Sequence, residues 1–311
     1  MISSEELEYP QILLDYQHGF FVSKIMFTAC ELGVFDLLHE VEGPASAATI
    51  ATRLNTSVDG MERLLNACVG LKLLKVDLKN NEGCYSNTDL SAVYLVKSSP
   101  RSLYHLMMYS NQTLYSCWKY LIEAVREGKC QPERAFGISS KEIFESVYRK
   151  CVSVLGCTGA LAKLFLSTYN ESTVTVMDLP KVVQATKKDL ETDERIHFLE
   201  GDFFNDPIPE ADLFIMARII HCWTEDKCLE LLRKIYQSCK PGGAVLLVAS
   251  LLNEDKSGPI DSLVYSLRML IQTEGKERTP SEYTKLLTDA GFSTIEVKVT
   301  GKFYDAILAR K

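Results

Sequence analysis

A histidine and a glutamate that lie far apart in the sequence could together carry acid–base chemistry. His221 follows an apolar run over residues 213–217 that is typical of a buried strand. Histidine changes charge near neutral pH, so it is suited to taking a proton from a substrate. Glu277 lies just before a predicted helix at 280–290 and could bind the far ring nitrogen, which would fix the tautomer. Each residue taken alone is more often structural than catalytic.

Two glycines and an acid follow the pattern of a nucleotide site. Gly156 and Gly159 lie between a predicted strand and a predicted helix, where glycine allows a ligand to approach the helix N-terminus. Asp178 comes 22 residues after Gly156, at the end of the next predicted strand. An acid at that distance is where a ribose hydroxyl is held. An ordinary strand–helix turn with a surface aspartate is the alternative.

A third predicted strand ends in Gly201, Asp202 and Phe203. Ligands of parallel sheets bind beyond the carboxyl ends of the strands. Asp202 could therefore accept a hydrogen bond from an adenine amino group, and Phe203 could flank the ring. A plain turn explains these three residues equally well.

The segment 268–279 offers two further candidates, Met269 and Gln272. They are three residues apart, so a helix would place them on one face. A helix end with solvated charges is the alternative that these residues favour by themselves.

The second half of the chain alternates β-branched runs with amphipathic segments, which predicts a mostly parallel sheet covered by helices on both faces. The expected strands are 152–155, 174–179, 196–199, 213–217, 244–250, 294–299 and 304–308, and the expected helices are 160–168, 182–190, 225–239 and 280–290.

The first half shows the helix–helix–hairpin pattern of a winged-helix domain. Helices are expected at 12–32, 47–54, 58–71 and 101–126, with a hairpin over 74–86. The third of the first three helices, with the residue that follows it, offers only Asp59, Glu62, Arg63 and Lys72 as charges. This composition favours a role in dimerisation over DNA reading.

The composition excludes several classes of protein. The 311 residues are 46% hydrophobic and 24% charged with a net charge of −7, as in a soluble globular protein of about two domains. The acidic balance argues against nucleic acid and membrane partners. Ten cysteines without a C-x-x-C pair predict reduced thiols in the cytoplasm. No cluster of metal ligands is visible in the sequence, so no metal is expected.

Taken together, several segments resemble the S-adenosylmethionine-dependent O-methyltransferases of the plant-caffeate and animal-hydroxyindole type. The segments of the second half are 178–180, 201–204, 218–221, 240–243 and 274–279, and those that match the hydroxyindole enzymes are 19–24, 29–38, 124–128 and 304–311.

The resemblance implies an α/β fold in which a winged-helix dimerisation domain, residues 1–110, precedes a Rossmann-like methyltransferase domain, residues 111–311, that includes linker helices. It implies a homodimer that methylates the 5-hydroxyl of N-acetylserotonin, a hydroxyindole, with S-adenosylmethionine as donor. It implies His221 as general base and Glu277 as the acid that orients it. The implied cofactor contacts are Tyr148, Gly156, Gly159, Asp178, Gly201, Asp202, Phe203 and Arg218, and the implied substrate contacts are Cys222, Arg268, Met269 and Gln272.

The chain also departs from the family pattern at functional positions. A stretch of a few dozen residues between Tyr148 and the glycine run is missing, and Ser153 stands in place of an acid. Cys222, Arg268 and Ala249 replace an aspartate, an asparagine and a glutamate. The alternative to an active enzyme is therefore an impaired homologue or splice product that acts as a dimer partner or ligand-binding protein.

Overall fold

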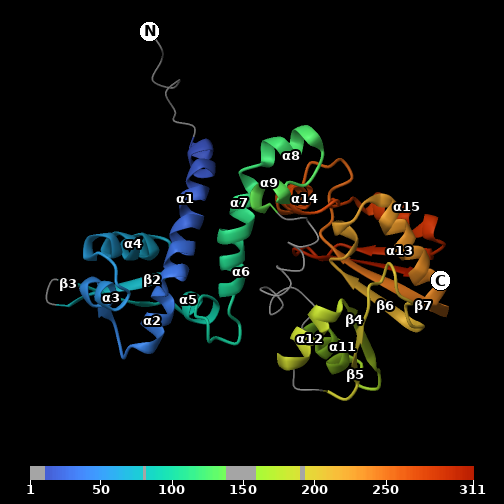
Figure 1. Cartoon of the computed structure of the whole chain (residues 1–311), viewed down its shortest axis with the longest axis horizontal. Coiled ribbons are helices and arrows are strands. Elements are labelled where there is room, and N and C mark those ends of the chain that lie inside the picture. The colour runs from blue at the N-terminus through green and yellow to red at the C-terminus, as the bar shows by residue number, and fades with distance from the viewer. Residues whose placement is uncertain (1–10, 80–81, 138–158, 190–192) are drawn as a thin grey trace, which may run out of the picture. The chain divides into compact units, whose positions relative to one another are not determined.

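The chain divides into two units, Met1–Tyr115 and Ser116–Lys311. A computed structural model describes residues 11–79, 82–137, 159–189 and 193–311 (Figure 1). Each unit contains its own hydrophobic core. Across the described residues, no helix combines the length and the apolar character needed to cross a membrane.

The first unit places helices around a small antiparallel sheet. Serine and threonine caps begin several helices, as when the Ser57 hydroxyl accepts from the amide of Gly60. The sheet order is β1-β3-β2, so the predicted hairpin is present with one extra short strand. The elements are α1 (Gln11–Leu32), α2 (Val34–Glu40), β1 (Ala45–Ser46), α3 (Ala47–Arg53), α4 (Val58–Gly70), β2 (Leu74–Lys79), β3 (Glu82–Asn87), α5 (Asp89–Tyr94) and α6 (Tyr104–Tyr109).

Helix α1 carries a long apolar surface that its own unit does not cover. Phe27, Ala29 and Cys30, near its C-terminal end, are buried in the core of the unit. The preceding turns instead expose large side chains, and Tyr16 is 71% exposed. A surface of this size on one helix is typical of a protein–protein interface. The exposed residues are Ile12, Leu13, Tyr16, Phe20, Phe21 and Val22.

The segment 101–126, which was expected to be helical, is helical over 104–118 and 121–127, but it is not one regular α-helix. The structure has α6, then a π-helical turn η2 (Ser110–Leu114), then α7 (Tyr115–Trp118) and α8 (Leu121–Glu127). In the wide turn the buried Asn111 accepts from Lys24 Nζ at 2.8 Å and donates to Glu31 Oε2 at 2.8 Å. These bonds to α1 satisfy a polar side chain that a regular apolar pattern cannot reveal.

The second unit contains two described sheets. In the first, β4 (Val174–Asp178) and β5 (Ile196–Glu200) are parallel. In the second, the order is β6-β7-β9-β8. Strands β6 (Ala211–Ala217) and β7 (Cys239–Ala249) are parallel, whereas β8 (Ser293–Lys298) and β9 (Asp305–Arg310) close the sheet in antiparallel pairs. The strand predicted at 152–155 lies outside the described residues.

The predicted helices of this unit are present within a few residues of their expected bounds. The helices α13 and α15 pack against each other, and they bury Leu231, Leu232, Tyr283 and Leu287 with Leu247 of β7. This packing forms the main apolar core behind the carboxyl end of β6. The helices are α9 (Pro132–Phe136), α11 (Ala160–Thr168), α12 (Pro180–Asp189), α13 (Glu225–Ser238), α14 (Ile260–Gln272) and α15 (Pro280–Ala290).

Strand β7 begins five residues before its predicted start at residue 244. The strand begins at Cys239, which pairs with Ala211 of β6. The register between the two strands shifts between Ala211 and Leu213. At Gly243 a Cβ atom would lie 2.6 Å from the carbonyl oxygen of Asp212, so only glycine allows the two strands to approach here. A glycine-rich sequence usually predicts a turn, which is why the early start was not expected.

Candidate active site

His221 lies directly beyond the carboxyl end of β6. The chain leaves the strand through Arg218, whose φ of 59° is in the left-handed region that non-glycine residues rarely adopt. The amide of Arg218 still donates to Val248 of β7 at 2.9 Å, which anchors the turn to the sheet. A short 3-10 helix, η3 (Ile220–Cys222), then carries the histidine.

His221 and Glu277 form a buried pair. The His221 Nδ1 and Glu277 Oε1 atoms are 2.6 Å apart, and the two residues are 5% and 1% exposed. The hydrogen bond expected between them is therefore present. With Nδ1 donating to the carboxylate, the neutral ring has its lone pair on Nε2, where a proton can be accepted.

The environment of His221 favours its charged form. Burial lowers the pKa of the imidazole, but hydrogen bonds and charges from Cys222 and Glu277 outweigh this effect and raise the pKa to about 9. Once deprotonated, this histidine is a stronger base than an ordinary one.

The guanidinium of Arg218 contacts two tyrosine rings, those of Tyr265 and Tyr304. Its guanidinium carbon is 5.3 Å from the ring centre of Tyr265 and 5.4 Å from that of Tyr304, and it donates to the Tyr304 hydroxyl. Both distances are within the range of cation–π attraction. Tyr265 of α14 and Tyr304 before β9 were not among the sequence candidates, although Tyr265 lies one helical turn before Arg268.

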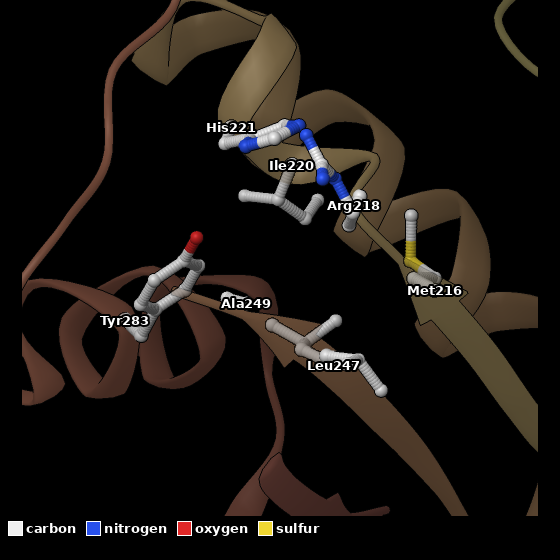
Figure 2. Close-up of a pocket in the computed structure, with 8 residues that line it drawn as sticks. Met216, Arg218, Ile220, His221, Leu247, Ala249 and Tyr283 are labelled. Carbon is white, nitrogen blue, oxygen red and sulfur yellow. The ribbon is translucent and has the colours of Figure 1, made fainter. Parts of the chain in front are cut away.

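Figure 2 shows the wall behind His221. Arg218 and His221 lie above Leu247 and Ala249 of β7, and the Tyr283 hydroxyl of α15 points toward them. The recess lined by these residues has no room for a water molecule. It is therefore a packed wall. Ala249 forms part of this wall.

The loop after β5 follows the pattern of an adenosine site. Asp178 ends β4, and its carbonyl accepts from the buried Gly201 at 2.9 Å, so the two positions are adjacent. The Asp202 carboxylate accepts from the amide of Phe204 at 3.0 Å and from Asn205 Nδ2 at 2.8 Å. A Cβ on Gly201 would lie 2.7 Å from the Met177 side chain. Two acids beside a crowded glycine at the carboxyl edge of parallel strands fit a ribose and an adenine.

A lysine of α13 holds this loop. Lys234 Nζ donates to the carbonyls of Phe203, Phe204 and Asp206 at 2.8, 2.9 and 2.9 Å. The ring of Phe204 packs edge-on against Trp223, 4.9 Å away, two residues after His221. These contacts join the loop after β5 to the loop of the histidine.

The glycine run is described only at its end. Gly159 has a φ of 68° and begins α11, a left-handed conformation that glycine adopts without strain. Tyr148 and Gly156 lie outside the described residues.

The four substrate candidates occupy α14 and η3. Met269 and Gln272 are both buried, at 4% and 8% exposure. Arg268 Nε donates to Gln272 Oε1 at 3.0 Å, and the guanidinium lies 5.2 Å from the ring centre of Tyr265. Arg268 thus shares that ring with Arg218. Cys222 is half-buried, with its sulfur 3.9 Å from the carbonyl oxygen of Arg218.

Among the described residues, no group of three or more histidine, cysteine, aspartate or glutamate side chains could hold a metal ion.

Two family models match the chain. Residues 14–97 match an O-methyltransferase dimerisation domain, and residues 146–293 match an O-methyltransferase domain. The chain belongs to the O-methyltransferase family.

Within the O-methyltransferase family, the chain is similar over its full length to acetylserotonin O-methyltransferases. Acetylserotonin O-methyltransferase from chicken (Gallus gallus) is 52% identical, and the human enzyme is 45% identical, with all of each chain covered. The crystal structure of human N-acetylserotonin methyltransferase in complex with SAM superposes with a TM-score of 0.92 at 44% identity, covering 100% of this chain and 99% of that one. The chicken alignment spans 346 positions against 311 residues here, so the chicken protein carries residues that this chain lacks.

Proposed function

We propose that this protein transfers a methyl group from S-adenosylmethionine to the 5-hydroxyl of N-acetylserotonin, which yields melatonin. The observation that carries the proposal is the buried His221–Glu277 pair, 2.6 Å apart at the carboxyl end of β6. The full-length likeness to acetylserotonin O-methyltransferases supports the choice of acceptor. It also favours an enzyme over an impaired homologue.

The donor would bind at the edge formed by β4 and β5. Asp178 would hold the ribose hydroxyls, and Asp202 and Phe203 would hold the adenine beside Gly201. Gly159, Arg218 and, outside the described residues, Tyr148 and Gly156 complete the proposed contacts. When bound, S-adenosylmethionine supplies an electrophilic methyl group on a sulfonium.

His221 acts as the general base in this proposal. Its Nε2 atom would take the proton of the acceptor hydroxyl as the oxygen forms a bond to the methyl carbon. The bond between that carbon and the sulfonium sulfur would break in the same step, S-adenosylhomocysteine would leave, and Glu277 would stabilise the imidazolium that results. Such proton transfer contributes about 10²–10⁴-fold to the rate. Alignment of acceptor and donor contributes the rest, up to about 7–11 kcal/mol of the barrier.

The acceptor would lie against the α14 side of the histidine. Met269 and Gln272 would form the wall of the indole site, with Cys222 and Arg268 near its polar groups. Arg268 binds Gln272 and Tyr265, so its charge is already partly satisfied without an acidic acceptor.

We also propose that the protein is a cytoplasmic homodimer. The match to a dimerisation domain and the exposed apolar surface of α1 support the dimer. The cysteines that the structure describes are all free thiols, which suits a reducing compartment.

The test is a methyl-transfer assay with mass detection of the product. The purified protein is incubated with S-adenosylmethionine and either N-acetylserotonin or N-acetyltryptamine, which lacks the 5-hydroxyl. Methylation of the first acceptor alone is expected. Absence of melatonin with a folded protein that still binds S-adenosylmethionine would contradict the proposal.

A further inference from the structure

Arg278 is a buried cation that reaches both ends of the loop carrying His221. The residue is 1% exposed and directly follows Glu277. Its Nη1 donates to the carbonyl of Ile220 at 3.2 Å, and its Nη2 donates to the carbonyl of Trp223 at 3.2 Å. These two carbonyls flank the histidine, so one rigid guanidinium spans the whole of η3.

The same segment contacts the loop at two further points. A Cβ at Gly275 would lie 2.1 Å from the carbonyl oxygen of His221, so the two backbones touch where only glycine fits. Glu277 binds the imidazole itself. Residues 275–278 therefore contact the backbone, the ring and both ends of the histidine loop.

Packing alone does not require an arginine at this place. Burying a cation is costly unless hydrogen bonds satisfy it, and the buried Nε of Arg278 has no hydrogen-bond partner among the residues that the structure describes. The Cys228 thiol already donates to the Ile220 carbonyl at 3.1 Å, so that oxygen is not unsatisfied without the arginine. What the guanidinium adds is a fixed distance between two carbonyls.

We propose that Arg278 is a positioning residue for methyl transfer, which sets the place of His221 by holding the carbonyls of Ile220 and Trp223. The residue touches neither donor nor acceptor in this scheme. It acts through the backbone of η3, and this inference rests on the proposed role of His221.

Arg278→Lys and Arg278→Gln test the proposal. Either variant keeps a donor for one carbonyl but cannot span both. We expect kcat to fall about 10- to 100-fold, the range in which a small misplacement of a catalytic group is felt. The KM for N-acetylserotonin and the affinity for S-adenosylmethionine measured by calorimetry should stay within about twofold. Arg233→Met is the control, because the exposed Arg233 of α13 also donates to a backbone carbonyl, that of Asp289 in α15, which is not part of η3.

A kcat equal to that of the parent in both substitutions would overturn the proposal. So would a parallel loss of kcat, S-adenosylmethionine affinity and melting temperature in both, since that pattern describes a purely structural residue. If Arg278→Lys kept its activity and Arg278→Gln lost it, the positive charge would matter and the bridge between the two carbonyls would not. This result would also overturn the proposal.

A second measurement does not depend on turnover. In protein labelled with ¹⁵N-histidine, the side-chain resonances of His221 are assigned with His221→Gln. They should shift or broaden in Arg278→Lys and remain unchanged in Arg233→Met. A parent that folds but makes no melatonin refutes the proposed function, whereas unchanged His221 resonances in Arg278→Lys refute the role of Arg278.

Discussion

Glu277 Oε1 lies 2.6 Å from His221 Nδ1, and both side chains are buried although 56 residues separate them in the chain. The hydrogen bond couples the charge of the imidazole to the Glu277 carboxylate. The second carboxylate oxygen, Oε2, has no hydrogen-bond partner among the described residues. Glu277 is one of the influences that raise the pKa of His221, so this contact decides how the proposed enzyme responds to pH and to mutation.

Replacing Glu277 by glutamine keeps the shape of the side chain and removes its charge. We expect the pKa of His221 to fall, because one of the influences that raise it is lost, and kcat to drop about 10- to 100-fold. The pH–rate profile of kcat/KM should rise toward pH 9 in the parent and level off at lower pH in Glu277→Gln.

The control for this experiment is Glu274→Gln, because Glu274 is a half-exposed partner of Lys227 on the surface. It should leave the profile unchanged. An identical pH midpoint in the parent and in Glu277→Gln would contradict the coupling of the pair.

The stability of the protein should fall at alkaline pH. The pKa of His221 is raised in the folded state, from 6.5 to about 9, so its contribution is complete below about pH 6.5 and is lost as pH rises through 9. A shift of this size corresponds to about 3 kcal/mol. Urea unfolding between pH 6 and 9.5 measures the loss, and the difference between the parent and His221→Gln isolates it. A constant difference across that range would contradict the raised pKa.

Lys234→Met should weaken binding of S-adenosylmethionine. The substitution removes three hydrogen bonds that hold the loop 203–206. We expect the Kd to rise about tenfold, since bonds from a charged donor contribute about 1.5–3 kcal/mol each and part of the loss is recovered by water. Calorimetry measures the change. Lys240→Met, which removes only a surface pair with Asp212, should bind like the parent.

Restoring the family residues at two positions should improve turnover. Arg268→Asn removes a guanidinium that binds Gln272, and Cys222→Asp places a carboxylate beside His221. Because both positions border the proposed acceptor site, their effects should couple and not simply add. Turnover of N-acetylserotonin by the four members of the cycle tests this. Strict additivity would argue against a shared site.

The exposed apolar surface of α1 should mediate self-association. Tyr16→Glu combined with Phe20→Glu introduces two charges where Tyr16 is 71% and Phe20 is 52% exposed. We expect the parent to sediment as a dimer at micromolar concentration and the double variant as a monomer. Leu78→Glu, which alters a 79% exposed residue on β2, should leave the dimer intact. A monomeric parent would contradict the proposed homodimer.

Periodicity by itself determined most of the secondary structure. The helix at 280–290 was expected and has those bounds in the structure, where Thr279 and Glu282 form a capping box and Pro280 begins the helix. These signals are local, so they can be found without the fold. The π-helical turn within the segment 101–126 was not expected, and its Asn111 is bonded to Lys24 and Glu31, which are remote in sequence.

The residue types also pointed to His221 and Glu277, because acid–base chemistry restricts the choice of side chain and strand ends restrict its place. Only the tertiary structure decided that the two meet within 2.6 Å, that Arg278 binds the carbonyls on either side of His221, and that Lys234 holds the loop after β5. The contacts of Arg278 and Lys234 have no signature in sequence. An arginine or lysine that binds backbone carbonyls is read in sequence as a surface charge, since carbonyls occur at every residue and only packing selects which ones it reaches.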